Sequence, residues 1–117
     1  MPNLDNIRLW VAALRSGEYQ QGFSALHRPE DNTFCCLGVA CEIARKSGLD
    51  LTVGQLGTSV SYDSHVDYLP LRVQNWLGVD SFNPRLNGTL ATELNDFNRA
   101  SFAEIADAIE VEYNLKG

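Results

Sequence analysis

The sequence predicts an α+β fold that is mainly α, with four to five helices packed around a buried central helix and one small β-hairpin. Three observations support this prediction. Apolar residues recur at helical spacing in several segments, one such segment is apolar on nearly every side, and a β-prone stretch punctuated by glycines follows it. The chain has 117 residues, the length of one domain, so we expect a single domain over residues 1–117.

The two helices that define this fold come early in the chain. The first is predicted over residues 4–16, where apolar residues follow the helical period and Asn3 can serve as the N-cap. The central helix is predicted over about residues 34–47, and a helix that is apolar all round is buried on all sides. Gly38 in its interior permits close approach of another element, for which we expect the first helix.

The β-hairpin is predicted over residues 50–63, because β-prone runs there flank two glycines. Short helices are expected after Pro70 and from Leu90, the latter with Thr89 as its N-cap and an end at residues 95–98. The last helix begins at a capping box, in which the Ser101 side chain accepts from a first-turn amide and Glu104 reaches back to the cap.

Two stretches, residues 18–32 and 81–88, lack any periodicity and predict irregular loops. The first is 15 residues long, a length at which a loop is often functional.

The net charge of −6 and the isoelectric point near 4.7 argue against direct binding to nucleic acid, which requires clustered Lys and Arg. The first residues do not resemble a secretory signal, and the apolar run over residues 34–44 is shorter than the roughly 20 residues that span a bilayer. Three cysteines within seven residues suit a reducing compartment. We therefore expect a cytoplasmic protein without membrane contact.

Cysteine chemistry provides one candidate site. Cys35 and Cys36 fall in the first turn of the predicted central helix, where the positive end of the helix dipole favours a thiolate. With His65 as the base, either thiol would make the chain a cysteine hydrolase of peptidase type. The alternative is that the cysteines are small buried hydrophobes. Their spacing with Cys41 does not match a zinc site, so neither metal nor cofactor is expected.

A ligand site is the second candidate. Tyr19 and Gln21 follow the first helix, and Asn95 and Asp96 end a predicted short helix. Aromatic and amide groups of this kind stack on and hydrogen-bond to a small ligand. The alternative is that these side chains fasten loops to the core.

An acidic surface is the third candidate. Residues 89–117 hold six acidic and two basic side chains, so most of the net charge lies there. Glu104, Asp107 and Glu110 of the last helix predict a face that contacts a protein partner, because charge patterns steer association. The alternative is an ordinary solvated helix face.

Ordered sequence blocks extend over nearly the whole chain. They are W-V-x-x-L-R-S-G-x-Y-x-Q-G from residue 10, F-C-C-L-G-V-x-C from residue 34, L-N-D from residue 94 and S-F-x-E-I-A-D from residue 101. With these blocks the chain resembles a family of small proteins of tailed phages and prophages that has no established activity. The resemblance implies residence in the host cell cytoplasm and implies no mechanism.

The sequence therefore predicts a non-enzymatic phage-type binding protein, acting as a host-takeover or anti-defence factor. Its target is either a host protein or a small nucleotide-like ligand held by the four residues of the ligand site. A nucleotide would require Arg15, Arg28 or Arg99 close to its phosphates. A homo-oligomer is left open.

Overall fold

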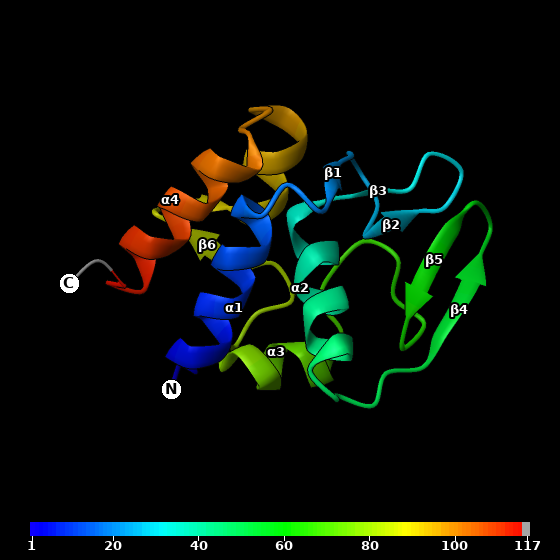
Figure 1. Ribbon diagram of the computed structural model, residues 1–117, viewed down its shortest axis with the longest axis horizontal. Helices are drawn as coiled ribbons and strands as arrows, with labels where there is room; N and C mark the ends of the chain where they lie inside the picture. The colour runs from blue at the N-terminus through cyan, green and yellow to red at the C-terminus, as the bar shows by residue number, and fades with distance from the viewer. Residues whose placement is uncertain (116–117) are drawn as a thin grey trace.

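Five helices and three small sheets form the fold of residues 1–115, the part of the chain that the computed structural model describes (Figure 1). In chain order the elements are α1 (Leu4–Arg15), β1 (Gln20–Gln21), β2 (His27–Arg28), β3 (Thr33–Phe34), α2 (Cys36–Lys46), β4 (Val53–Leu56), β5 (Ser59–Tyr62), α3 (Leu71–Leu77), β6 (Arg85–Leu86), β7 (Thr89–Leu90), the π-helix η1 (Glu93–Phe97) and α4 (Phe102–Glu112). Strands make up 17% of the structure against 42% for helices, so the prediction of a mainly α fold is wrong.

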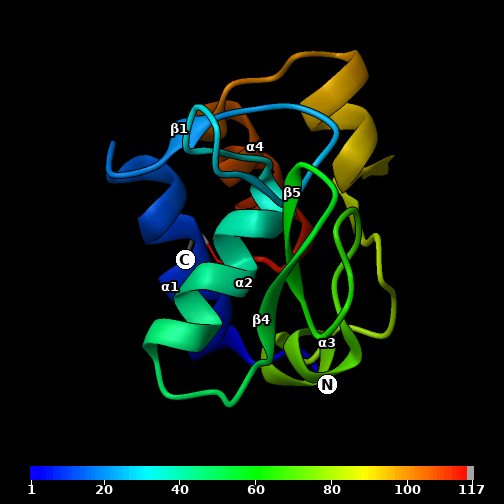
Figure 2. The same cartoon turned by 90° about the vertical axis from the view of Figure 1, so that its right-hand side faces the viewer.

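The prediction that helices surround a central helix is also wrong. Figure 1 shows α1 between α4 and α2, with the β4–β5 hairpin at the opposite end of the molecule from α4. Figure 2, turned by 90°, likewise shows α2 between α1 and the hairpin. On the hairpin side the Tyr62 hydroxyl donates a 3.0 Å hydrogen bond to the Glu42 carboxylate of α2. The apolar residues of α2 are therefore buried between a helix and β-structure, which the same sequence pattern cannot distinguish from a helix bundle.

The helix ends follow the predicted capping chemistry. The Asn3 side chain accepts a 3.1 Å hydrogen bond from the Asn6 amide at the start of α1. At the start of α4, Ser101 and Glu104 form both hydrogen bonds of the capping box. These two predictions are confirmed.

Gly38 does permit a close approach, but its neighbour is Leu26 and not the first helix. A Cβ built on Gly38 would overlap the backbone carbonyl of Leu26. The segment before β2 therefore runs directly across α2. This contact brings the loop of residues 22–26 to the N-terminal end of α2.

The residues 18–32 predicted as a loop contain two of the strands of a small sheet. Strand β3 lies in its middle, parallel to β1 (Gln20 opposite Thr33) and antiparallel to β2 (His27 opposite Phe34). The hairpin predicted over residues 50–63 is present as β4 and β5. Two-residue strands are too short to show a period of two, and this is why the sequence pattern missed the small sheet.

The short helix predicted from Leu90 begins later, because Thr89 and Leu90 form strand β7, and it is the π-helix η1 that ends within residues 95–98 as expected. The core between the elements is apolar, and the Trp10 indole donates a 2.9 Å hydrogen bond to the Cys36 carbonyl within it. Within residues 1–115, no helix is both long and apolar enough to cross a membrane.

Candidate functional site

Asn95 is the fully buried centre of a hydrogen-bond network that joins three segments. Its Oδ1 accepts from the Gln21 side chain at 3.0 Å and from the Cys36 amide at 3.2 Å. Its Nδ2 donates to the Gly22 carbonyl at 2.9 Å and to the Asp96 carboxylate at 2.8 Å. Asn95 thus caps the N-terminus of α2 from a distant segment and fixes the loop after β1.

The backbone on both sides of this network has unusual geometry. Asn95 and Asp96 belong to η1, where the Asn98 amide donates to the Glu93 carbonyl five residues earlier, and π-helical turns are rare and frequent at functional sites. Ser24 has a left-handed backbone conformation with φ of 64°, and its amide donates a 2.9 Å hydrogen bond to the Asp96 carboxylate. Such strained positions cluster at functional sites.

A cavity of about 270 Å³ opens beside this network, and we call it the Asp96 pocket. It is lined by Ser24, Ala25, Cys35, Asp67, Tyr68, Thr92, Asp96 and Phe97. Four segments meet there: the loop after β1, the start of α2, the loop before α3, and the stretch from Thr92 through η1. The pocket therefore combines several kinds of chemical group: two carboxylates, two aromatic rings, the hydroxyls of a Ser and a Thr, and one thiol.

The aromatic side chains of the Asp96 pocket are exposed at its rim. Phe97 is 80% exposed and Tyr68 is 42% exposed. The Tyr68 ring packs against Phe82, with ring centroids 4.9 Å apart, and Phe82 is itself 55% exposed. We call Tyr68, Phe82 and Phe97 the aromatic rim. Exposed apolar groups gathered at a cavity are typical of an interaction site.

The cysteines do not have the environment of nucleophiles. Cys35 is 3% exposed although it lines the Asp96 pocket, and burial raises the pKa of its thiol to about 12, against the opposing effect of the Gly38 and Leu37 amides. Burial likewise raises the pKa of Cys36 well above its ordinary value. A thiol with a raised pKa is protonated at neutral pH, which is the opposite of what a nucleophile requires.

His65, the base of the hydrolase alternative, lies exposed in the loop after β5. Its backbone pairs with Tyr62 through two hydrogen bonds of 2.9 Å and 3.0 Å. Among the described residues that line the Asp96 pocket there is no histidine. The structure therefore does not bring His65 into the pocket that Cys35 lines.

Of the predicted ligand residues, the structure brings together Gln21, Asn95 and Asp96 but not Tyr19. The Tyr19 hydroxyl accepts a 3.0 Å hydrogen bond from Lys46, and its ring packs edge-on against Phe34. Tyr19 lines a separate hollow between the C-terminal ends of α1 and α2. Of the four predicted residues, only Asp96 lines the Asp96 pocket, while Gln21 and Asn95 support it from behind.

Four residues that line the pocket are not indicated by any pattern in the sequence: Ser24, Ala25, Thr92 and Phe97. The signal that could have found Ser24 is the long loop that contains it. Nothing in the local sequence indicates that Asp67 and Phe97 face the same space, because only the tertiary fold brings their segments together.

The predicted acidic face of α4 is used within the chain. Arg15 of α1 pairs with both Asp107 and Glu110, the latter at 2.8 Å. Glu104 forms the capping box of its own helix. Asp107 and Glu110 therefore hold α4 against α1, a role that the sequence does not indicate, whereas Glu104 has the capping role predicted for it.

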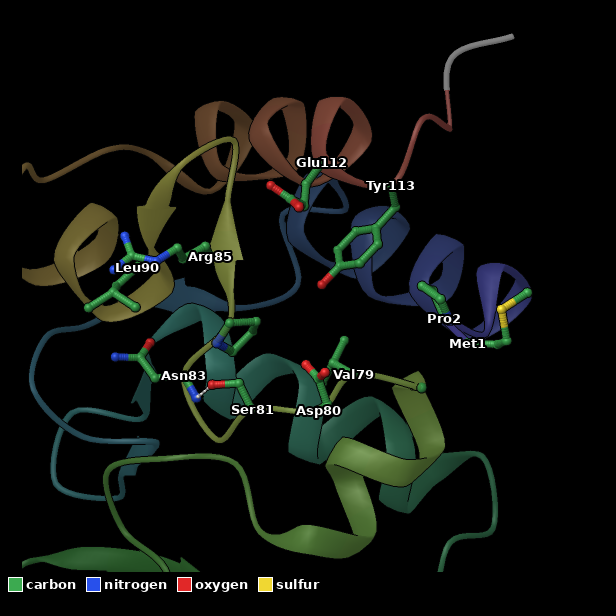
Figure 3. A pocket seen from close by; sticks show the side chains of 12 residues that line it. Met1, Pro2, Val79, Asp80, Ser81, Asn83, Arg85, Leu90, Glu112 and Tyr113 are labelled. Atoms are coloured by element: carbon green, nitrogen blue, oxygen red, sulfur yellow. Dashed lines mark hydrogen bonds between the residues drawn. The ribbon is translucent and has the colours of Figure 1, made fainter.

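A second cavity, of about 500 Å³, lies between the N-terminal residues, the segment from Gly78 to Arg85, and the end of α4 (Figure 3). Figure 3 shows the Tyr113 ring reaching into it from α4, with the Asp80 carboxylate on the facing wall. Burial raises the pKa of Tyr113 to about 12, and Glu112 and Asp80 add to that effect. Glu112 also accepts a 2.9 Å hydrogen bond from the Asn87 amide, so its carboxylate holds the β6–β7 turn.

Metal binding has no support in residues 1–115, where no three or more His, Cys, Asp and Glu side chains are grouped to hold an ion. The three cysteines are free and buried.

A comparison with protein-family models finds one described as Domain of unknown function (DUF8296), which matches residues 5–114. The matched region runs from α1 through α4 and includes every residue that lines the Asp96 pocket. No curated protein and no solved structure matches the chain.

Proposed function

Because the chain belongs to the family described as Domain of unknown function (DUF8296), whose description assigns no activity, we propose a function from the geometry of the site: a non-catalytic binding protein that holds its target in the Asp96 pocket. The observation that carries the proposal is the meeting of four chain segments around one cavity of about 270 Å³. Pockets that combine apolar walls with a few convergent polar groups are the usual form of a binding site.

The pocket is rigidly supported before any target arrives. Asn95 makes four hydrogen bonds behind it, and the Gln21 side chain makes a further one, of 2.8 Å, to the Ala100 carbonyl. A site that is already ordered loses little conformational entropy on binding. This support favours a role in recognition.

Catalysis is the weaker alternative because the candidate nucleophile is protonated. Rapid alkylation of the folded protein by iodoacetamide at neutral pH would contradict the binding proposal and favour the hydrolase. We expect slow alkylation that accelerates when urea exposes the thiols. Chain unfolded in urea is the matched control, since it carries the same three cysteines without their burial.

The charge of the pocket does not suit the nucleotide-like ligand. No Lys or Arg is found among the described residues that line it. Arg15 is paired with Asp107 and Glu110, and the Arg99 guanidinium stacks on the Phe23 ring at 4.4 Å. A host protein is the better target. The phage resemblance implies the host cell cytoplasm as the setting. A chain that binds a host protein there would act as a host-takeover or anti-defence factor.

Protein-observed NMR with a library of small fragments tests the proposal. We expect some fragments to shift the amide resonances of Ser24, Asp96 and Phe97 together and saturably. Phe97→Ala should weaken the binding of those fragments. Val111→Ala removes an exposed apolar side chain elsewhere, on α4, and should leave their binding unchanged. A library without any fragment that shifts these three resonances would contradict the proposed function.

A further inference from the structure

We propose that the Asp96 pocket takes the guanidinium group of an arginine side chain presented by a protein partner. The inference rests on the proposed function and names the chemistry that the pocket recognises. Three features carry it: the charge of the lining, the aromatic rim and the size of the cavity.

The lining carries two carboxylates whose charge is not balanced within the pocket. Asp67 makes no hydrogen bond or ion pair with any residue in the described part of the chain. Asp96 accepts two hydrogen bonds at Oδ1, from Ser24 and Asn95, and both come from uncharged groups. A cation in the pocket would therefore offset the negative charge of both carboxylates. A guanidinium group suits a carboxylate because it can donate two parallel hydrogen bonds to it.

The aromatic rim adds the second part of the recognition. Phe97 and Tyr68 line the same cavity as the carboxylates and are 80% and 42% exposed. A cation over an aromatic face is attracted by the negative face of the ring. The chain already makes such a contact with an arginine, where the Arg99 guanidinium lies 4.4 Å from the Phe23 ring centroid. Arginine is preferred to lysine because its planar guanidinium group can stack on an aromatic ring and bind a carboxylate at the same time.

The size of the cavity indicates a side chain and not a whole metabolite. Its volume of about 270 Å³ is just below the range of roughly 300 to 1,000 Å³ that is typical of pockets for drug-sized ligands. The exposed Phe82 ring extends the apolar surface beyond the cavity, next to Tyr68. A partner surface that inserts one side chain would cover this ring as well, while a free small cation would leave it exposed.

An NMR titration with short peptides tests the inference. The probe is acetyl-Gly-Gly-Arg-Gly-Gly-amide, and the matched peptide has citrulline in place of arginine, which keeps the shape and removes the charge. We expect the arginine peptide to shift the Ser24, Asp96 and Phe97 amides saturably, with the citrulline peptide at least tenfold weaker and a lysine peptide between them.

Two variants localise the contact. Asp67→Asn and Phe97→Ala should each weaken binding of the arginine peptide several-fold without changing the melting temperature, because both side chains are exposed and lie outside the core. Asp80→Asn and Val111→Ala, at exposed positions away from the Asp96 pocket, should leave binding unchanged.

The outcomes separate the two proposals. Equal binding of the arginine and citrulline peptides, or no binding of either while neutral fragments still occupy the pocket, would overturn the guanidinium inference and leave the binding function standing. If neither the peptides nor any fragment shifted the pocket resonances, both proposals would fail.

Discussion

The Gln21 side chain donates a 3.0 Å hydrogen bond to the Oδ1 of Asn95, although 74 positions separate the two residues. This contact holds the loop after β1 against η1. The same Asn95 oxygen accepts from the Cys36 amide, so one buried atom also satisfies a donor at the start of α2. The position of Asp96 in its pocket depends on this arrangement, because Asp96 follows Asn95 directly.

Asn95→Ala should lower the free energy of unfolding by about 3 kcal/mol, since it leaves the buried Cys36 amide and Gly22 carbonyl without this partner. Urea denaturation measures the change. Asn98→Ala is the matched control, because Asn98 is exposed in the next turn and its side chain makes no hydrogen bond with the described residues. A loss for Asn95→Ala no larger than the control's would show that the network does not support the fold.

Gly38→Ala should destabilise the protein by several kcal/mol, because the added methyl group would overlap the Leu26 carbonyl and separate the 22–26 loop from α2. Thermal unfolding measures the effect. Gly54→Ala in β4 is the control, since its methyl group would meet only the Ser61 hydroxyl, at 3.2 Å, and should cost less than about 1 kcal/mol. Similar melting temperatures for the two variants would contradict the close contact at Gly38.

The sequence predicts those elements whose signals are local. The Asn3 cap, the Ser101–Glu104 capping box and the hairpin around Gly57 each depend on residues within a few positions of one another, and each is present. The small sheet of β1, β2 and β3 is different, because its strands have two residues each and are too short to show a periodic pattern.

The site shows the same division. Gln21, Asn95 and Asp96 could be selected because polar side chains in irregular segments are poor core residues. That Asn95 is nevertheless fully buried, with all of its hydrogen bonds made inside the chain, could not be foreseen from residue type. Asp67 and Phe97 reach the pocket only through the packing of two separate loops, which no spacing in the sequence encodes.

The acidic face of α4 must be tested with its structural role in view. Glu104→Ala should cost about 1 kcal/mol in urea denaturation, because it removes half of the capping box, whereas Glu104→Gln should keep most of the stability, since an amide can also reach back to the cap. Equal losses for the two variants would show that the charge of Glu104 matters and the hydrogen bond does not. Any partner pull-down with variants of this face requires these stability values beside it.

The buried thiols and tyrosines should make the protein less stable in alkali. The pKa of Cys35 is raised by burial from 9.0 to about 12, and the pKa of Tyr62 is raised mainly by burial and then by Glu42. A group with a raised pKa in the folded state binds its proton more tightly there, so its stabilisation is complete below the unfolded pKa and is lost as the pH rises toward the folded value.

The urea midpoint should therefore fall between about pH 9 and about pH 12, the window in which an unfolded Cys35 loses its proton and the folded one does not. Cys35→Ala removes one of the contributing groups, so its midpoint should fall less steeply with pH, even if it starts lower because a buried side chain has been shortened. Arg8→Gln, at an exposed site where Arg8 pairs with Asp5, should keep the parent slope. A midpoint that did not change with pH in the parent protein would mean that the thiol is not buried in solution, and it would reopen the assignment of Cys35 as a nucleophile.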